Sequence, residues 1–193
     1  MKKGLLFVMS GPSGVGKGTI REHLMKDESL NLGFSISMTT REPRANEVDG
    51  VHYFFTTKEK FVEAVRNGEL LEHAMFVSNY YGTPKAYVEK LRNEGKNVLL
   101  EIEVEGAKQV KERVEDQISI FITPPSMEEL EKRIRGRQSE SEEAIQNRLE
   151  KARNEMKLMG EYKYIVCNED VVLATDLVST IMKHYINKNE NEQ

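Results

Sequence analysis

The chain has 193 residues and a formal net charge of −4 at neutral pH, with 38% hydrophobic and 31% charged residues. This length suits one domain with a sizeable core, and the composition is that of a globular protein rather than a disordered or fibrous one. The slightly acidic balance argues against a general nucleic-acid or anionic-membrane binder, although a local basic cluster could still receive phosphates. We expect no nucleic-acid or membrane partner, and we infer no obligate protein partner.

The single cysteine, Cys167, excludes an intrachain disulfide and favours a reducing compartment. It lies in the apolar run "YIVC", so we expect a small buried side chain without a chemical role. The apolar stretch of "MKKGLLFVMSG" is too short for a signal peptide, and no segment approaches the length of a membrane span. We therefore expect a cytoplasmic protein.

The first half of the chain predicts a strand, a glycine-rich loop and a helix, followed by a less regular insertion. Residues 4–9 form an unbroken apolar run, and Ile20 and Leu24 recur at helical spacing within 17–27. Between about 34 and 84 we expect a small inserted subdomain with short strands in 34–37, 52–55 and 70–77 and a helix over 58–68.

The second half alternates helices with apolar strands, which predicts an α/β fold with a parallel sheet. Pro84 is expected at the first position of a helix that stops at Gly95, and Ser126 with Glu129 forms a capping-box signature. The carboxyl end of the strand beginning at 97 carries Glu101 and Glu103. The expected elements are a helix over 85–95, strands over 97–104 and 118–123, helices over 127–137 and 142–156, a strand within 162–167, and a helix over 171–186 whose apolar face includes Leu177.

The loop "SGPSGVGKGT" matches the G-x-x-x-x-G-K core of a P-loop through Gly11, Gly16 and Lys17. Glycines let several backbone N–H groups point at one anion, the following helix adds its positive end, and the lysine reaches the outer phosphates. A plain turn is the alternative, but a strand before the loop and a helix after it favour phosphate binding. The predicted ATP-binding residues are Gly11, Pro12, Ser13, Gly14, Val15, Gly16, Lys17, Gly18 and Thr19.

Gly18 stands where G-K-[ST] proteins carry the hydroxyl that holds Mg²⁺. We therefore expect the ion to be held by nucleotide oxygens and waters, one of them bound to Glu101, with no direct protein ligand assigned. Glu101 and Glu103 alternate along the chain, so one of them can face the phosphates; a solvated strand end is the alternative. This pattern favours a small-nucleotide kinase over a switch-type GTPase.

Together with the P-loop sequence, six further segments occur in an order that resembles the guanylate kinase family over nearly the whole chain. These segments are "FSISMTTREPRANEVDGVHYFF", "GELLEHAMFVSNYYGTP", "GKNVLLEIEVEGA", "FITPPSMEELEKRIRGR", "NRLEKA" and "IVCNED". The resemblance implies a P-loop three-layer fold with a central parallel sheet, a small mixed α+β GMP-binding subdomain and a helical lid. It also implies transfer of the terminal phosphoryl group of ATP to GMP, with Mg²⁺, in purine nucleotide metabolism, and use of dGMP. As one domain, the chain would divide into a core (about 1–33, 84–125 and 160–186), a GMP-binding subdomain (about 34–83) and a lid (about 126–159).

The resemblance also implies the acceptor site. Guanidinium groups donate in a planar fork to phosphate oxygens, and one carboxylate can accept from both guanine N1–H and the exocyclic amine. For a lone tyrosine, packing is the ordinary alternative. The family positions for the GMP phosphate fall on Arg41, Arg44, Tyr53 and Tyr81, and those for guanine on Ser37, Glu72, Thr83 and Glu103.

Arg133 and Arg137 are four residues apart and share a helix face, and with Arg148 they resemble the lid arginines of the family. A charge run by itself is more often a solvated face. The catalytic set implied by the resemblance is Lys17, Arg41, Arg133, Arg137 and Arg148, and Asn168 matches the position near the adenine of ATP. The family commonly has aspartate where this chain has Glu103.

Two other functions are alternatives to this reaction. Guanylate-kinase-like modules of scaffold proteins bind phosphopeptides without catalysis, but they usually have a damaged P-loop, whereas Lys17 is present here. A kinase of similar fold could act on another phosphorylated acceptor, such as a ribose bisphosphate. Glu72 together with Ser37 favours guanine recognition.

Overall fold

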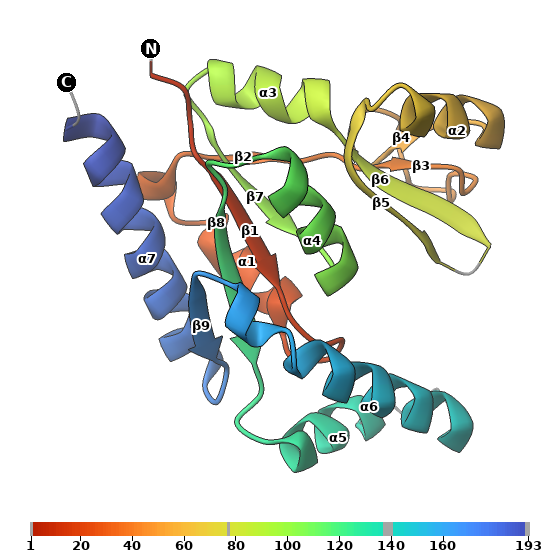
Figure 1. Cartoon of the computed structure of the whole chain (residues 1–193), viewed down its shortest axis with the longest axis vertical. Helices are drawn as coiled ribbons and strands as arrows, with labels where there is room; N and C mark the ends of the chain where they lie inside the picture. Colours follow the sequence, from red (N-terminus) through yellow and green to blue (C-terminus); the bar gives the residue numbers. More distant parts are fainter. Residues whose placement is uncertain (1, 77, 137–140, 192–193) are drawn as a thin grey trace.

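The computed structural model describes residues 2–76, 78–136 and 141–191. Its centre is a five-stranded sheet in which every strand pairing is parallel (Figure 1). The strand order is β2 (Leu32–Phe34), β7 (Asn97–Glu101), β1 (Leu6–Ser10), β8 (Ile118–Thr123) and β9 (Tyr164–Cys167). The all-parallel arrangement directs all five carboxyl ends toward one edge, where ligands bind in open α/β sheets.

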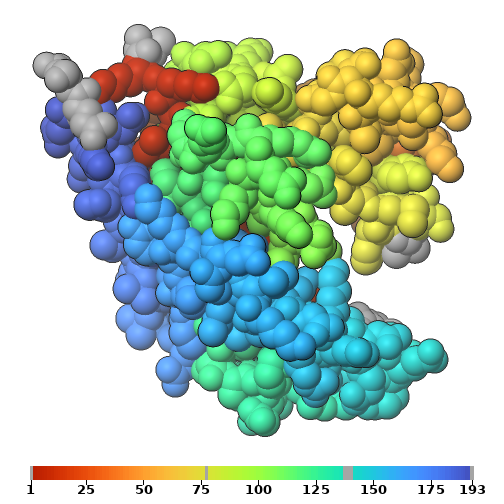
Figure 2. All heavy atoms as spheres, in the orientation of Figure 1, coloured from red at the N-terminus to blue at the C-terminus, as the bar shows by residue number. Residues whose placement is uncertain are grey.

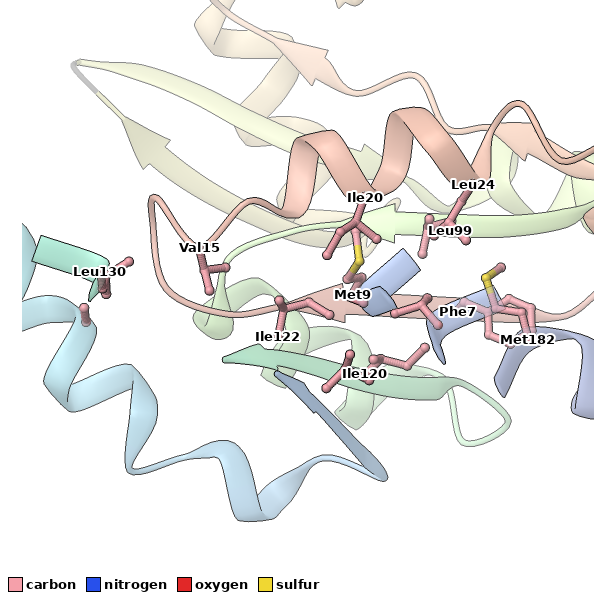
Figure 3. Close-up of a cluster of buried hydrophobic side chains, with 14 of the residues drawn as sticks. Phe7, Met9, Val15, Ile20, Leu24, Leu99, Ile120, Ile122, Leu130 and Met182 are labelled. Carbon is pink, nitrogen blue, oxygen red and sulfur yellow. The ribbon is translucent and has the colours of Figure 1, made fainter. Parts of the chain in front are cut away.

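Helices cover both faces of this sheet, giving three layers. On one face, α1 (Lys17–Leu24) and α7 (Val171–Asn191) pack on Phe7, Met9, Ile120 and other strand residues, as Figure 3 shows for part of this cluster. On the other face, α3 (Lys85–Asn93) and α4 (Val104–Arg113) pack on a second apolar cluster. All five residues of β1 are buried, which explains why the strand reads as a continuous apolar run.

A second, four-stranded sheet lies beside the first, in the order β4 (Phe54–Phe55), β3 (Met38–Thr39), β6 (Asn79–Pro84) and β5 (Leu70–Phe76). The β3–β4 pairing is parallel, whereas β6 pairs antiparallel with both β3 and β5. Helix α2 (Lys58–Arg66) packs on this sheet through the fully buried Phe61, and Thr57 caps its first turn.

Helices α5 (Met127–Arg135) and α6 (Glu142–Met156) project from the carboxyl edge of the main sheet (Figure 1). Ser126 and Ser141 are their N-caps and accept from the backbone N–H groups of Glu129 and Ala144. Arg135 joins the two helices, because its guanidinium pairs with both Glu131 and Glu142. Short 3₁₀ turns lie at η1 (Glu28–Leu30) and η2 (Met159–Glu161).

The predicted fold class is confirmed, but the sequence interpretation missed α4 and placed Glu103 on a strand. The strand β7 ends at Glu101, and Glu103 is the N-cap residue of α4. The run "EIEV" continues the alternation of a strand, whereas the buried positions that follow, Val104, Ala107 and Val110, have helical spacing.

The prediction of a strand over 34–37 is also wrong, except at Phe34. Phe34 ends β2, which pairs with β7 in the main sheet, and the next strand begins only at Met38. The chain passes between the two sheets at 35–37, so these residues pair with neither as strands. Pro84 is the N-cap of α3 rather than its first helical residue.

Two side chains expected to be buried are exposed. Cys167 lies on the edge strand β9, where Val166 points into the core and its two neighbours point outward. Leu177 is 54% exposed, because the buried stripe of α7 is confined to Ala174, Val178, Ser179 and Met182. In the described part of the chain, no helix combines the length and apolarity needed to cross a membrane.

Candidate active site

The P-loop folds as a tight bend between β1 and α1, and three of its glycines adopt a positive φ. Gly11, Gly14 and Gly16 have φ values of 146°, 88° and 100°. A Cβ on Gly11 would lie 2.3 Å from the carbonyl oxygen of Ile122, so the loop also packs too closely for a side chain. Gly16 precedes α1 without any side-chain cap, which leaves the first N–H groups of the helix open to an anion.

Lys17 lies back over this loop. Its Nζ donates to the carbonyl oxygens of Gly11, at 2.5 Å, and Pro12, at 3.0 Å. Burial lowers the pKa of Lys17, and the negative charges of Glu101, Glu155 and Glu103 oppose that shift. The ammonium group is therefore held within the bend, where phosphates would neutralise part of the cost of burying it.

Glu101 ends β7 beside the P-loop helix. A Cβ built on Gly18 would lie 3.7 Å from Glu101 Oε1, an ordinary contact distance. Glu101 Oε2 is buried and has no hydrogen-bond partner among the described residues; Arg21 Nη1 lies 3.2 Å away as an ion pair, without hydrogen-bond geometry. A buried carboxylate oxygen of this kind fits a metal-bound water, and the described residues contain no cluster of three or more His, Cys, Asp or Glu that would bind a metal directly.

A cleft of about 260 Å³ opens where β2 and β7 meet the second sheet. It is lined by Ser37, Tyr53, Thr83 and Glu101, together with Ser35 and His52, which sequence analysis did not single out. Figure 2 shows the molecule hollowed between the yellow β5–β6 part and the cyan α5–α6 part. Three of the predicted acceptor residues thus share one cleft with the carboxylate at the end of β7.

Glu72 lies on β5 and is only 7% exposed. Its Oε1 accepts from Thr83 Oγ1 at 2.6 Å, and α4 approaches so closely that a Cβ on Gly106 would lie 2.9 Å from Oε2. Burial raises the pKa of Glu72, while the Thr83 hydrogen bond and the charge of Arg113 act in the opposite direction. The Thr83 hydroxyl and the close approach of α4 therefore fix the position of this carboxylate.

Arg41 is held by a carboxylate that sequence analysis missed. Its Nη2 lies 2.8 and 2.9 Å from the two carboxylate oxygens of Glu47, and Oε2 of Glu47 also accepts from the backbone N–H of Arg44. These hydrogen bonds lower the pKa of Glu47 to about 2. The Glu47 position lies in an irregular loop, so neither periodicity nor a short motif could have identified it.

Two predicted phosphate-binding tyrosines lie beside this pair. The Arg41 guanidinium is 5.5 Å from the ring centroid of Tyr53, and the rings of Tyr53 and Tyr81 meet edge to face at 6.1 Å. The side chain of Arg44 is exposed. The structure therefore gathers Arg41, Tyr53 and Tyr81, whereas Arg44 joins them through its backbone.

Of the α5–α6 arginines, Arg148 contacts the P-loop and Arg133 contacts the residue that follows β9. Arg148 Nη2 donates to Ser13 Oγ at 2.8 Å, and Arg133 Nη1 donates to the carbonyl oxygen of Asn168 at 3.0 Å. Arg137 lies outside the described residues.

Glu103 faces α6 rather than the cleft. Its Oε2 lies 2.7 Å from Lys151 Nζ, which ties the N-terminus of α4 to α6. The charge of Glu103 still raises the pKa of Glu72, so the two carboxylates lie close enough to interact. Guanine recognition by Glu103 stays a prediction.

The comparisons with known proteins place the chain in a family. The guanylate kinase family model matches residues 3–185. The chain belongs to the guanylate kinase family. A guanylate kinase of Oceanobacillus iheyensis is 53% identical over 94% of this chain and 88% of its own length, and one of Lactococcus lactis is 53% identical over 95% of this chain and 90% of its own length.

A solved structure agrees with this membership. The crystal structure of guanylate kinase from Anaplasma phagocytophilum is 34% identical, with a TM-score of 0.72, over 95% of this chain and 87% of that chain. The family resemblance seen in the sequence is confirmed.

Proposed function

We propose that this protein transfers the terminal phosphoryl group of ATP to GMP, giving ADP and GDP, in purine nucleotide metabolism. The observation that carries the proposal is the pairing of a P-loop containing Lys17 with a separate cleft lined by Thr83, whose hydroxyl donates to the buried carboxylate of Glu72. Relatives that cover most of the chain are named guanylate kinases. Use of dGMP as a second acceptor is part of the proposal.

The donor side acts by alignment and charge compensation, without a covalent intermediate. The backbone N–H groups within the P-loop (residues 11–19, Pro12 excepted) and the Lys17 side chain hold the ATP phosphates, and Arg133 and Arg148 approach from α5 and α6. Arg137 is proposed to join them. Bound Mg²⁺ would compensate phosphate charge; Glu101 would hold one of its waters, since Gly18 offers no hydroxyl.

The acceptor side orients GMP and selects its base. Arg41, Arg44, Tyr53 and Tyr81 bind the GMP phosphate, and Arg41 exchanges its contact with Glu47 for that phosphate. Glu72 accepts from guanine N1–H and the amine, Ser37 and Thr83 face O6, and Glu103 serves the amine. Adenine has an unprotonated N1 and lacks the C2 amine that guanine carries next to N1–H, so it would leave the Glu72 carboxylate unmatched.

We propose that this single domain has three parts with different roles. A core (about 1–33, 84–125 and 160–186) carries the P-loop, a GMP-binding subdomain (about 34–83) carries the acceptor residues, and a lid (about 126–159) carries the arginines. We also propose a cytoplasmic location, on the basis of a single cysteine that cannot form an intrachain disulfide.

A coupled assay that offers GMP, dGMP, AMP and ribose phosphates with ATP and Mg²⁺ tests the proposal. We expect turnover with GMP and dGMP and no comparable turnover with AMP. Phosphorylation of a ribose phosphate instead of GMP would support the other kinase reaction. Binding of phosphopeptides without any turnover would support the scaffold module.

Lys17→Met tests the donor site. We expect kcat to fall about a hundredfold or more, as it does when one preorganised charge-stabilising donor is lost. Steady-state kinetics provide the measurement, and Lys26→Met, at a position after α1, provides the control. Near-normal turnover in Lys17→Met would remove this lysine from the mechanism.

A further inference from the structure

The side chain of Asn168 lies beneath the P-loop. Asn168 follows the edge strand β9 and is 4% exposed. Its Nδ2 donates to the carbonyl oxygen of Val15 at 2.8 Å, across 153 positions of sequence. The same nitrogen would lie 2.5 Å from a Cβ on Gly16, so the amide packs directly against the loop.

The backbone of Asn168 is fixed on both sides. Its N–H donates to the carbonyl oxygen of Thr123, at the end of β8, and its carbonyl oxygen accepts from Arg133 of α5. The side-chain amide is therefore held on a rigid strand end.

The bond to Val15 sets the direction of a neighbouring donor. In a planar trans peptide, the carbonyl of Val15 and the N–H of Gly16 point in opposite directions, and no cis peptide occurs in the described chain. Holding the Val15 oxygen on the Asn168 side therefore turns the Gly16 N–H toward the opposite side of the loop. Within the described residues that N–H donates no hydrogen bond, so it is available to a phosphate oxygen.

We propose that Asn168 is a positioning residue of the P-loop, whose side-chain N–H holds the Val15–Gly16 peptide in its phosphate-binding orientation. This inference rests on the proposed function, because it assigns the loop to ATP phosphates. It differs from the contact with adenine that the family resemblance implies, since an effect exerted through the loop backbone does not depend on the base.

Two variants separate the donor from the rest of the side chain. Asn168→Asp keeps the size and an acceptor oxygen but removes the N–H donor, and Asn168→Ala removes both. Glu169→Gln, at the exposed next position, is the matched control. All measurements are made at pH 8, well above the ordinary aspartate pKa of about 3.9.

Calorimetric binding of ATP and of inorganic tripolyphosphate, which has no base, gives the decisive readout. In both Asn168 variants we expect the two ligands to lose affinity alike, by about tenfold, as for loss of one buried hydrogen bond. GMP affinity should stay at the wild-type value. Unchanged tripolyphosphate binding with weakened ATP binding would overturn the proposal in favour of adenine recognition, and so would wild-type affinity for both ligands in Asn168→Asp.

Hydrogen exchange gives a test that needs no nucleotide. In both variants we expect faster amide exchange in peptides covering residues 10–20, at a temperature below the unfolding transition, with no change in Glu169→Gln. Exchange equal to that of the wild type would contradict the proposal. Turnover of ATP and GMP by the wild-type protein tests the proposed function separately, so a failure of one can be told from a failure of the other.

Discussion

Single carboxylates in this protein differ sharply in their surroundings. Glu47 is in contact with solvent and paired with Arg41, and its pKa is lowered to about 2. Glu72 is buried, and burial raises its pKa. The first carboxylate therefore loses its proton at a lower pH than an ordinary glutamate, and the second at a higher pH.

The raised pKa of Glu72 makes two quantities depend on pH. In the proposed site, GMP binding requires the ionised carboxylate as acceptor, so affinity should fall as pH decreases through the raised pKa, at a higher pH than for an ordinary glutamate of pKa 4.5. Stability has the opposite dependence: the folded state holds the proton more tightly than the unfolded chain. The contribution of Glu72 to stability is therefore lost as pH rises from the unfolded pKa through the folded one.

Glu72→Gln should separate these effects. We expect GMP affinity to fall about 10- to 100-fold, because an amide donor replaces one charged acceptor facing guanine. Above the pH at which Glu72 ionises, the variant without ligand should melt at a temperature equal to or above that of the wild type. The difference in melting temperature should decrease as the pH is lowered. Calorimetry and thermal unfolding between pH 4 and pH 8 measure both, with exposed Glu69→Gln as control; a melting difference that is independent of pH would contradict the argument.

At the scale of elements, the helices that carry the arginines depend on their first turns. Helix α5 begins at Met127 because Ser126 accepts from the N–H of Glu129, and α6 begins after Ser141 in the same way. Leu130 and Ile134 of α5 are buried against the main core, and this packing aims Arg133 at Asn168. The cap and the apolar face together fix the position of the arginine.

Ser126→Ala should lower the free energy of unfolding by about 0.5–2 kcal/mol, the usual effect of losing an N-cap. For a domain of this size, each kcal/mol corresponds to roughly 2–4 °C in melting temperature. Scanning calorimetry provides the measurement. Ser126→Asp, which retains a capping oxygen, should melt close to the wild type, and equal melting of the alanine variant would show that the cap contributes nothing.

At the scale of the whole molecule, the donor and acceptor residues come from separate parts. Lys17 lies at the edge of the main sheet, Arg41 beside the second sheet, and Arg148 on α6, and the cleft lies where the main sheet meets the second sheet. Phosphoryl transfer requires aligned oxygens and exclusion of water from reactive ATP. We therefore expect the second sheet and the α5–α6 helices to move toward the core when both substrates bind.

Small-angle X-ray scattering tests this closure. A bisubstrate analogue, with adenosine and guanosine joined by a phosphate chain, should reduce the radius of gyration relative to the free protein. Addition of AMP at the same concentration is the control and should leave the curve unchanged. A curve that is also unchanged by the bisubstrate analogue would contradict closure.

Much of this fold could be predicted because its signals are local. The buried strands 6–10 and 118–123 are continuous apolar runs, and the capping residues Ser126 and Ser141 stand next to the helices they start. Helix α4 was missed because "EIEVEGAKQV" continues the alternation of the strand before it. Nothing in the local sequence marks Glu101 as the residue where the chain leaves the sheet.

The sequence by itself determined the P-loop and the family, because the glycines, the lysine, the preceding strand and the following helix lie within one short segment, and the other family motifs occur in order along nearly the whole chain. Only the tertiary structure decided which groups meet: Glu47 on Arg41, Lys151 on Glu103, and the amide of Asn168 on Val15. The physical reason is that hydrogen bonds and ion pairs depend on distance in space. Residues far apart in sequence reach that distance only after the sheet and its covering helices have packed.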